Sequence, residues 1–476
     1  MRTSSVSLAR SPIPPYNLHV VNRTSTQLVY DSGSLLLDGP APKCLPPHFE
    51  WDPRVEKHRA PAIARPGILR YLAECGERVL DRSSRATPLK LTLRARYAPH
   101  PYQKSALEAW VRKGGRGSVI LPTGAGKTFI ALGAIAHAGT STLVIAPTID
   151  LMTQWYSLLT DSFGIEIGIV GGGHRDPRDI TVTTYDSAYI HAADFGNLFD
   201  LLIFDEVHHL PSPKNQQIPI MSTALHRLGL TATYERQDGA HAMLDYLIGP
   251  VVYKLGVKDL KGEYLSDYET VRIKASLTEE ESERYAECAK RYFAFIRRIG
   301  LKPFGSGWDE FIKMTGYDES ARAALLAKQE MKRIVVGSER KLEVLDSLLK
   351  QHAVDKVIVF TEQNDLVYRI SREFLIPAIT HQTRPRERKW ILDGFKGELF
   401  RVIVTSKVLN EGIDVPSAKV AVILSGSASP REHLQRLGRI LRKSDKRRTA
   451  VLYEVVSSGT AETNVSSRRR KTDAYS

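Results

Sequence analysis

Cysteine is scarce in this chain of 476 residues, which contains three: Cys44, Cys75 and Cys288. They lie far apart and form no CxxC pair, so neither a zinc site nor a disulfide framework is expected, and a reducing compartment fits. Long hydrophobic runs are also missing, since none approaches the ~20 residues of a membrane span. The N-terminal residues have no continuous apolar core, so we expect no secretory signal and a cytoplasmic location.

Negative charge is in deficit, because 53 Asp and Glu face 67 Lys and Arg and leave a formal net charge of +14. An excess of this size indicates a polyanionic partner such as nucleic acid, although many soluble proteins are basic for other reasons. The length indicates several domains, at roughly 150 residues for each.

The organisation of the chain changes near residue 96. Residues 1–15 are rich in Ser, Pro and Arg and are expected to be disordered, and residues 16–95 have the pattern of a small α+β domain. Beyond them, short apolar runs alternate with helical segments in two series, which is typical of parallel sheets covered by helices. The runs are 118–121, 142–146, 180–184 and 201–205 in the first series and 356–361, 400–405, 420–424 and 450–455 in the second.

These two series predict an α/β fold with two parallel-sheet lobes, the first over 96–250 and the second over 251–476. Residues 275–335 are charged, have helical spacing and carry no strand signal. We therefore expect a helical insertion in the second lobe, at about 285–335.

A glycine-rich turn, PTGAGKT, joins the first apolar run to a helical pattern. Gly124 and Gly126 would let the backbone approach a bound anion, toward which the N–H groups of such a turn point. Lys127 would reach the β- and γ-phosphates, and Thr128 would place its hydroxyl on Mg²⁺. The longer G-x-x-x-x-G-K-[ST] pattern needs Gly where this chain has Leu121, so an ordinary strand–helix turn is the alternative.

Two acidic residues, Asp205 and Glu206, follow the apolar run 201–204. They would therefore lie at the carboxyl end of a strand, the edge at which open α/β sheets bind ligands. Asp205 suits a contact to Mg²⁺, and Glu206 is placed to activate the attacking water of phosphoryl transfer. Together with the Gly-Lys-Thr turn, the pair predicts a nucleoside-triphosphate site rather than a solvated loop. For His208, a polar link to other site residues is more plausible than a metal contact.

A basic helical pattern covers 433–442, HLQRLGRILR. Gln435, Arg439 and Arg442 are spaced i, i+4, i+7 and so share one stripe. Such a helix can present arginine fingers to a γ-phosphate, each worth roughly 10³–10⁵ in turnover. A basic solvated face is the alternative.

A series of short segments keeps a fixed order along the chain: HPYQ (100–103), LPTGAGKT (121–128), APTIDLMTQW (146–155), TTYDSA (183–188), DEVH (205–208), TAT (231–233), VIVFTEQND (357–365), TSKVLNEGIDVP (405–416) and QRLGRILR (435–442). This set resembles the motifs of a superfamily 2 helicase, and within that superfamily it most resembles the XPB family in its archaeal and bacterial form. The resemblance implies two RecA-like lobes, a damage-recognition-type N-terminal domain, a helical thumb insertion, and ATP and Mg²⁺ as cofactors.

The resemblance also implies roles for individual residues. Glu206 would be the catalytic base, Arg439 and Arg442 would be fingers, and Thr128 and Asp205 would serve Mg²⁺. The nucleotide would be bound by Gln103, Thr123, Gly124, Ala125, Gly126, Lys127, Thr128, Gly412, Asp414 and Gln435. Hydrolysis would be coupled to DNA movement by His208, Thr231 and Thr233.

The DNA contacts are implied in the same way. The RED element, implicated in opening DNA, reads Arg236-Gln237-Asp238 here and lacks its central Glu. Thr184, Thr361 and Thr405 follow predicted strands and would bind the DNA backbone, although a threonine after a strand is usually turn chemistry. The basic and aromatic segment 291–304 suits a strand-gripping thumb or, alternatively, an amphipathic helix that packs its own rings.

Three functions follow from the motifs and the resemblance. The first is an ATP-dependent 3′-to-5′ DNA helicase or translocase in excision-type repair, in which hydrolysis at the lobe interface opens DNA. The second is an ATP-gated clamp or translocase that opens DNA locally for a companion nuclease. The third is the motor subunit of a restriction or mobile-element system. DNA, at junctions of single-stranded and duplex segments, is the expected partner, and a nucleoid-associated protein of a prokaryotic host is expected.

Overall fold

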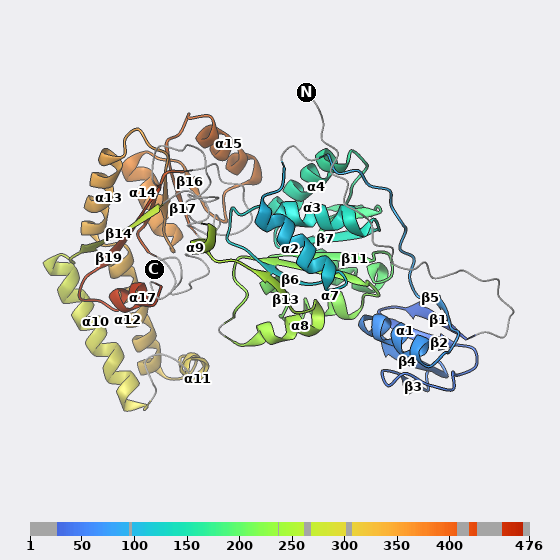
Figure 1. The fold of residues 1–476 in the computed structure, drawn as a ribbon. Helices are drawn as coiled ribbons and strands as arrows, with labels where there is room; N and C mark the ends of the chain where they lie inside the picture. The colour runs from blue at the N-terminus through green and yellow to red at the C-terminus, as the bar shows by residue number, and fades with distance from the viewer. Residues whose placement is uncertain are drawn as a thin grey trace, which may run out of the picture. The chain divides into compact units, whose positions relative to one another are not determined.

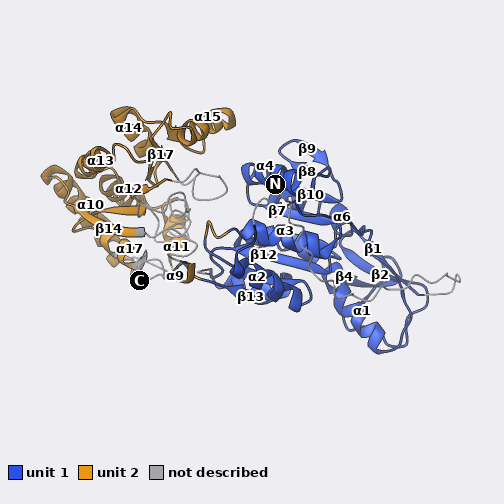
Figure 2. Cartoon of the chain, turned by 45° about the horizontal axis from the view of Figure 1, so that its top comes forward, with its two compact units in different colours: residues 1–122, 126–255 blue, residues 123–125, 256–476 orange. Residues whose placement is uncertain are grey.

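The computed structural model describes residues 26–94, 98–236, 238–260, 268–300, 307–406, 418–425 and 450–469. The chain divides into two compact units, one within 1–122 and 126–255 and the other comprising 123–125 and 256–476 (Figure 2). The described residues contain a small mixed sheet and two larger, largely parallel sheets with helices packed against them (Figure 1). The α/β fold with two parallel-sheet lobes is confirmed. The segment 1–15, expected to be disordered, lies outside the described residues.

A five-stranded sheet and one helix form the N-terminal part of the first unit. The sheet has the order β3-β4-β2-β1-β5, and only the β1–β5 pair is parallel. Leu28, Leu35 and Leu37 alternate with more exposed residues and face helix α1, so the period of two predicts the buried face. The elements are β1 (Gln27–Asp31), β2 (Ser34–Asp38), β3 (Glu50–Asp52), β4 (Lys57–Pro61), α1 (Arg65–Glu74) and β5 (Leu80–Arg82).

Arg65 connects this N-terminal part to the large sheet of the same unit. Its guanidinium donates to Asp81 Oδ2 at 2.7 and 3.0 Å, to Asp200 Oδ1 at 3.5 Å and to the Thr223 carbonyl at 3.1 Å. The Tyr30 hydroxyl makes a second connection, to the Ala193 carbonyl at 2.8 Å. Because Arg65 is buried, its charge depends on these partners.

The large sheet of the first unit has eight strands in the order β13-β6-β12-β11-β7-β10-β8-β9, and all neighbours except β8 and β9 are parallel. Three predicted runs coincide with β7, β10 and β11, whereas β12 is not predicted. The boundary expected at residue 250 falls just before β13. The strands are β6 (Arg116–Ile120), β7 (Thr142–Ala146), β8 (Gly168–Gly171), β9 (His174–Asp176), β10 (Ile180–Thr184), β11 (Leu201–Asp205), β12 (His226–Thr231) and β13 (Val251–Lys254).

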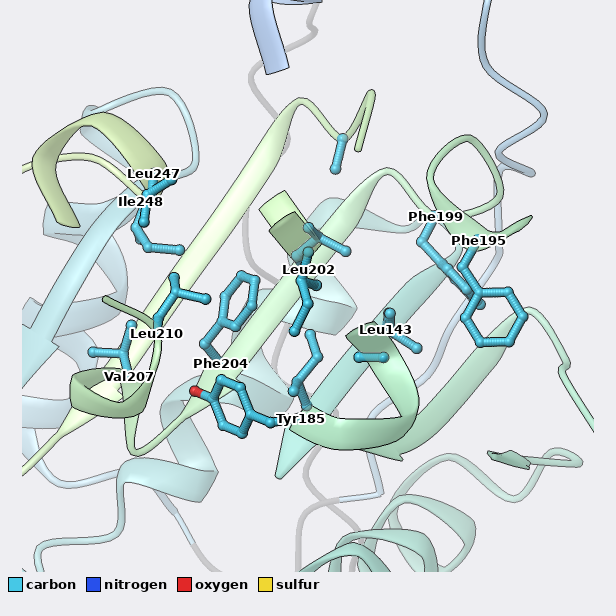
Figure 3. Close-up of a cluster of buried hydrophobic side chains, with 14 of the residues drawn as sticks. Leu143, Tyr185, Phe195, Phe199, Leu202, Phe204, Val207, Leu210, Leu247 and Ile248 are labelled. Atoms are coloured by element: carbon cyan, nitrogen blue, oxygen red, sulfur yellow. The ribbon is translucent and has the colours of Figure 1, made fainter. Parts of the chain in front are cut away.

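Helices pack on both faces of this sheet. Leu202 and Phe204 of β11 join Tyr185 and Phe195 in a buried cluster on one face, and Figure 3 shows the rings of Tyr185 and Phe204 beside each other, with centroids 6.2 Å apart. On β11, the alternate residues face the other side. The helices are α2 (Pro101–Arg112), α3 (Lys127–Ala138), α4 (Ile149–Phe163), α5 (Tyr185–Ile190), α6 (Ala192–Phe195), α7 (Gln217–Ile220) and α8 (Met243–Leu247).

The second unit contains a six-stranded sheet, all parallel, in the order β14-β19-β18-β15-β17-β16. A buried ion pair fixes the last helix to it, since Lys341 Nζ lies 2.7 Å from Glu462 Oε2 and donates to the Leu424 carbonyl. The elements outside the insertion are α9 (Val257–Leu260), β14 (Tyr268–Ala275), α13 (Glu339–Gln351), β15 (Val357–Phe360), α14 (Asn364–Phe374), β16 (Ala378–Ile379), α15 (Pro385–Lys396), β17 (Val402–Thr405), β18 (Val420–Ile423), β19 (Ala450–Ser457) and α17 (Glu462–Arg469).

The predicted helical insertion lies between β14 and α13. It comprises α10 (Glu279–Arg298), α11 (Trp308–Met314) and α12 (Glu319–Val336). Tyr292 and Phe295 are buried against Phe311 in a cluster of its own, so these rings serve as core, as the amphipathic-helix alternative expects. In the part of the chain that the structure describes, no helix is both long and apolar enough to cross a membrane.

We predict that Arg65→Met lowers the free energy of unfolding of the first unit by about 3 kcal/mol, because it leaves two partly buried carboxylates without their cation. Arg175→Met is the matched control, since Arg175 pairs with Asp194 on the surface, where both side chains are more than half exposed. The control should cost less than about 1 kcal/mol. Urea denaturation with limited proteolysis measures both, and equal losses would show that Arg65 does not secure the N-terminal part.

Candidate active site

The predicted phosphate turn connects β6 to α3. Gly124 and Gly126 have φ angles of 86° and 71°, in the left-handed region that glycine adopts readily. Gly126 directly precedes α3, so the turn leads into the N-terminus of a 12-residue helix, where main-chain N–H groups favour anions. Lys127 Nζ donates to the carbonyls of Leu121 and Pro122, at 3.2 and 3.5 Å, and so folds back over the turn.

Gln103 lies against this turn. Its side chain is buried, and its Oε1 accepts the His100 main-chain N–H at 2.9 Å in the capping box that begins α2. A Cβ atom added to Gly126 would lie 2.4 Å from Gln103 Nε2. The structure therefore brings the residue predicted to bind adenine next to the turn predicted to bind phosphate.

Asp205 is the last residue of β11, and its carboxylate is held on both oxygens. Oδ2 accepts the indole N–H of Trp155 at 2.9 Å, and Oδ1 accepts the main-chain N–H of Glu206 at 3.0 Å. Burial and the neighbouring Glu206 raise the pKa of the Asp205 carboxyl, whereas the Trp155 hydrogen bond and the Lys127 ammonium lower that pKa. Lys127, predicted to bind phosphate, and Asp205, predicted to serve Mg²⁺, are thus close enough for their charges to interact.

Glu206, His208 and Thr231 form a compact cluster. The Thr231 hydroxyl lies 3.3 Å from Glu206 Oε2 and 3.0 Å from His208 Nδ1, and these last two atoms are 3.4 Å apart. Thr231 Oγ1 also accepts the main-chain N–H of Thr233 at 3.1 Å. Glu206 has a φ of 48°, a conformation that costs energy for a residue with a side chain and is often found at functional sites. The structure therefore brings the predicted base together with the three predicted coupling residues.

Arg236, in the RED-like element, bonds within the protein. Its guanidinium donates to the His208 carbonyl at 2.8 Å and to the Asp238 carboxylate at 3.0 and 2.6 Å. The Arg236 hydrogen bonds hold the pKa of the Asp238 carboxyl well below its usual range. Arg236 therefore ties the RED-like element to the segment that carries Glu206.

The three threonines predicted to contact DNA are buried, and their hydroxyls bond within the protein. Thr184 Oγ1 accepts the Ser187 main-chain N–H and caps α5. The Thr361 hydroxyl lies 2.9 Å from that of Ser425, and Thr405 donates to the carbonyl of the residue that follows it. These bonds match the turn chemistry of strand ends, and DNA contacts by the three residues stay a prediction.

Six of the predicted site residues lie outside the described residues: Gln237, Gly412, Asp414, Gln435, Arg439 and Arg442. The predicted nucleotide-binding residues that the structure describes therefore all come from the motifs expected in the first lobe.

Magnesium fits the donors at this site. Thr128 offers a hydroxyl and Asp205 and Glu206 offer carboxylates, all hard oxygen ligands. The described residues contain no group of three or more His, Cys, Asp or Glu that could hold a metal without other ligands. Beside a nucleotide, Mg²⁺ usually takes only a few ligands from the protein, and phosphate oxygens and water molecules complete its coordination.

Sequence reasoning placed Trp155 in a motif but missed its contact, and it missed Tyr185 in the same way. The Tyr185 hydroxyl donates to the Asp205 carbonyl at 3.0 Å, so both residues hold Asp205. Trp155 lies three residues after Met152 and four before Leu159, a spacing that indicates only a buried helix face. No signal in the sequence distinguishes these rings from ordinary core residues.

The two parallel-sheet lobes, the phosphate turn and the Asp205–Glu206 pair define a nucleotide hydrolase of the helicase class. Three family models match the chain: "Xeroderma pigmentosum group B helicase damage recognition domain" at 28–82, "Type III restriction enzyme, res subunit" at 96–236 and "ERCC3/RAD25/XPB C-terminal helicase" at 314–472.

Curated relatives extend these matches. A protein of Sulfurisphaera tokodaii named "DNA 3'-5' translocase XPB2" is 41% identical over 447 residues, which cover 93% of this chain and 99% of that protein. Proteins named "DNA 3'-5' helicase XPB" from Kineococcus radiotolerans and Mycobacterium tuberculosis are 31% and 30% identical, over 79% and 78% of this chain and 62% of each of them. The chain belongs to the XPB family, and the resemblance stated from the motifs is confirmed.

We predict that Gly126→Ala destabilises the protein in two separable ways. The left-handed conformation costs a residue with a side chain about 1–2 kcal/mol, and the new methyl group would collide with Gln103. Gly114→Ala is the matched control, because Gly114 has a φ of 68° and no heavy atom within 4 Å of an added Cβ.

Thermal denaturation of the single variants and of Gly126→Ala combined with Gln103→Ala measures the two parts. When the combined variant is compared with Gln103→Ala alone, the loss of stability caused by Gly126→Ala should be close to the loss caused by Gly114→Ala. An excess that is unchanged without the Gln103 side chain would contradict the described packing of the turn.

Proposed function

We propose that this protein is an ATP-dependent DNA 3′-to-5′ helicase or translocase that acts in DNA repair of the excision type. One observation carries the proposal. Glu206 follows a central parallel strand beside the phosphate turn, where its carboxylate accepts a hydrogen bond from the Thr231 hydroxyl and lies 3.4 Å from His208 Nδ1. That arrangement suits a general base whose position depends on the conformation of β12 and of the segment that carries His208. The named activity of the nearly full-length relative from Sulfurisphaera tokodaii supports the direction of movement.

ATP and Mg²⁺ are the proposed cofactors. Glu206 would take a proton from the attacking water, while Lys127 and the N–H groups of the turn bind the phosphates. Thr128 and Asp205 would hold Mg²⁺, which neutralises charge on the phosphates when bound. Gln103 would select the base, and the nucleotide contacts from outside the described residues would be Gly412, Asp414, Gln435 and the fingers Arg439 and Arg442.

Coupling between hydrolysis and DNA would use the hydrogen bonds around Glu206. Thr231, Thr233 and His208 link this carboxylate to β12, and Arg236 links His208 to the RED-like element. In this proposal Arg236, Gln237 and Asp238 open or bind DNA, and the hydrogen bonds of Arg236 orient the element. DNA would also contact the first and second lobes near Thr184, Thr361 and Thr405.

We propose the domain division expected from the sequence, with a damage-recognition-like domain over 16–95, helicase lobes over 96–250 and 251–476 and a thumb at about 285–335, except that β13 belongs with the first lobe because it pairs with β6. The family models that match 28–82 and 314–472 support it. Arg291 and Arg298 of α10 are exposed and pair with Glu287 and Asp318, so DNA phosphates would have to compete with these carboxylates for a contact to the thumb.

The alternatives are weaker. The restriction-enzyme family model matches only the first lobe, and the flanking matches are to XPB models, which disfavours a restriction motor. A companion nuclease stays a prediction, as does a nucleoid-associated location, and both are compatible with a DNA translocase.

We predict that Glu206→Gln lowers DNA-stimulated ATP turnover by at least about 10³-fold while nucleotide affinity changes little, because the amide keeps the shape of the side chain but cannot accept the proton. Phosphate release and binding of a fluorescent ATP analogue measure the two effects. Glu166→Gln, a surface change on the same lobe, is the control and should retain parental turnover. Near-parental hydrolysis by Glu206→Gln would remove Glu206 from the role of base.

A further inference from the structure

Trp155 is buried on α4, and its indole N–H has a specific partner. The side chain is 3% exposed, and Nε1 donates to Asp205 Oδ2 at 2.9 Å. Packing alone does not need this donor, since Met152 and Leu159 fill the same helix face with apolar side chains. A hydrogen bond to a carboxylate contributes more than one to a neutral group, so the orientation of the indole matters to Asp205.

The bond leaves Asp205 able to accept further ligands. Each carboxylate oxygen can accept two hydrogen bonds, and the structure gives Oδ1 the Glu206 N–H and Oδ2 the Trp155 indole. The Tyr185 hydroxyl holds the Asp205 carbonyl, so the main chain is fixed as well. The remaining lone pairs therefore have defined directions, as a carboxylate that must meet a metal ion or its water requires.

We propose that Trp155 is a positioning residue for the Mg²⁺ of the nucleotide site and acts through Asp205. This inference rests on the proposed function, because it needs a nucleotide-bound Mg²⁺. The indole restricts the Asp205 carboxylate to one orientation. Loss of the indole lets the carboxylate rotate and weakens the binding of Mg²⁺. Trp155 itself touches neither nucleotide nor metal in this account.

The chain supplies a closely matched control. Trp110 is also buried in the first lobe, at 1% exposed, and its indole N–H donates to the Arg227 carbonyl at 3.0 Å. Trp155→Phe and Trp110→Phe therefore each delete one buried indole donor and keep an aromatic ring. Only the first deletion removes a bond to Asp205.

The test measures the affinity of the full chain for a fluorescent, non-hydrolysable ATP analogue with saturating Mg²⁺ and again with EDTA. The ratio of the two affinities is the gain due to Mg²⁺. In Trp155→Phe this gain should fall by about tenfold while the affinity in EDTA stays within twofold of the parent, as expected for a residue that orients a metal ligand. Trp110→Phe should keep the parental gain even if its melting temperature falls equally.

A parental gain in Trp155→Phe would overturn the inference and leave the proposed function intact. No gain in the parent protein would instead contradict the Mg²⁺ site on which the proposed function depends. If Trp155→Phe does not fold, ¹⁹F spectra of the unsubstituted chain, labelled with 5-fluorotryptophan at its five Trp, decide. Mn²⁺ added with the analogue should broaden one buried resonance selectively, and broadening of no resonance or of all five equally would overturn the inference.

Discussion

The parallel register between β11 and β12 is the constraint on which the site depends. Asp205 is paired with Leu230, so the next residues along the two strands, Glu206 and Thr231, meet at the same sheet edge. Their side chains then bond to each other and to His208. A shift of one residue would turn every side chain of one strand to the opposite face, so the buried core that fixes the register also fixes the geometry of the proposed site.

Around Glu206 and Thr231, aromatic residues that have no proposed chemical role hold the residues that have one. Tyr185 and Trp155 fix the main chain and the carboxylate of Asp205, and the αL conformation of Glu206 persists because its neighbours are so constrained. Arg236 extends the same network to the RED-like element. The segments proposed to bind the nucleotide and to open DNA therefore share one set of hydrogen bonds, through which a change at one end can reach the other.

The sequence predicted the parts of this fold that depend on contiguous burial. β7 and β11 are covered on both faces and form nearly continuous apolar runs, whereas β10 combines Ile180 and Val182 with three buried threonines; all three match the predicted ranges. β12 escapes such reasoning because it contains Arg227, whose guanidinium is buried only by virtue of the Leu247 and Ser222 carbonyls. The motifs likewise identified Asp205 and Glu206, but the partners that hold Asp205 come from α4 and α5, and only the fold brings these together.

Strand displacement shows whether this protein is a DNA motor and in which direction it moves. Duplexes with a single-stranded 3′ or 5′ tail are incubated with ATP and Mg²⁺ while hydrolysis is followed in the same samples. We predict that DNA stimulates hydrolysis and that only the duplex with the 3′ tail is displaced, which would also show that Gln237 is tolerated in the RED-like element. Hydrolysis that DNA does not stimulate, or displacement from the 5′ tail alone, would contradict a 3′-to-5′ DNA motor.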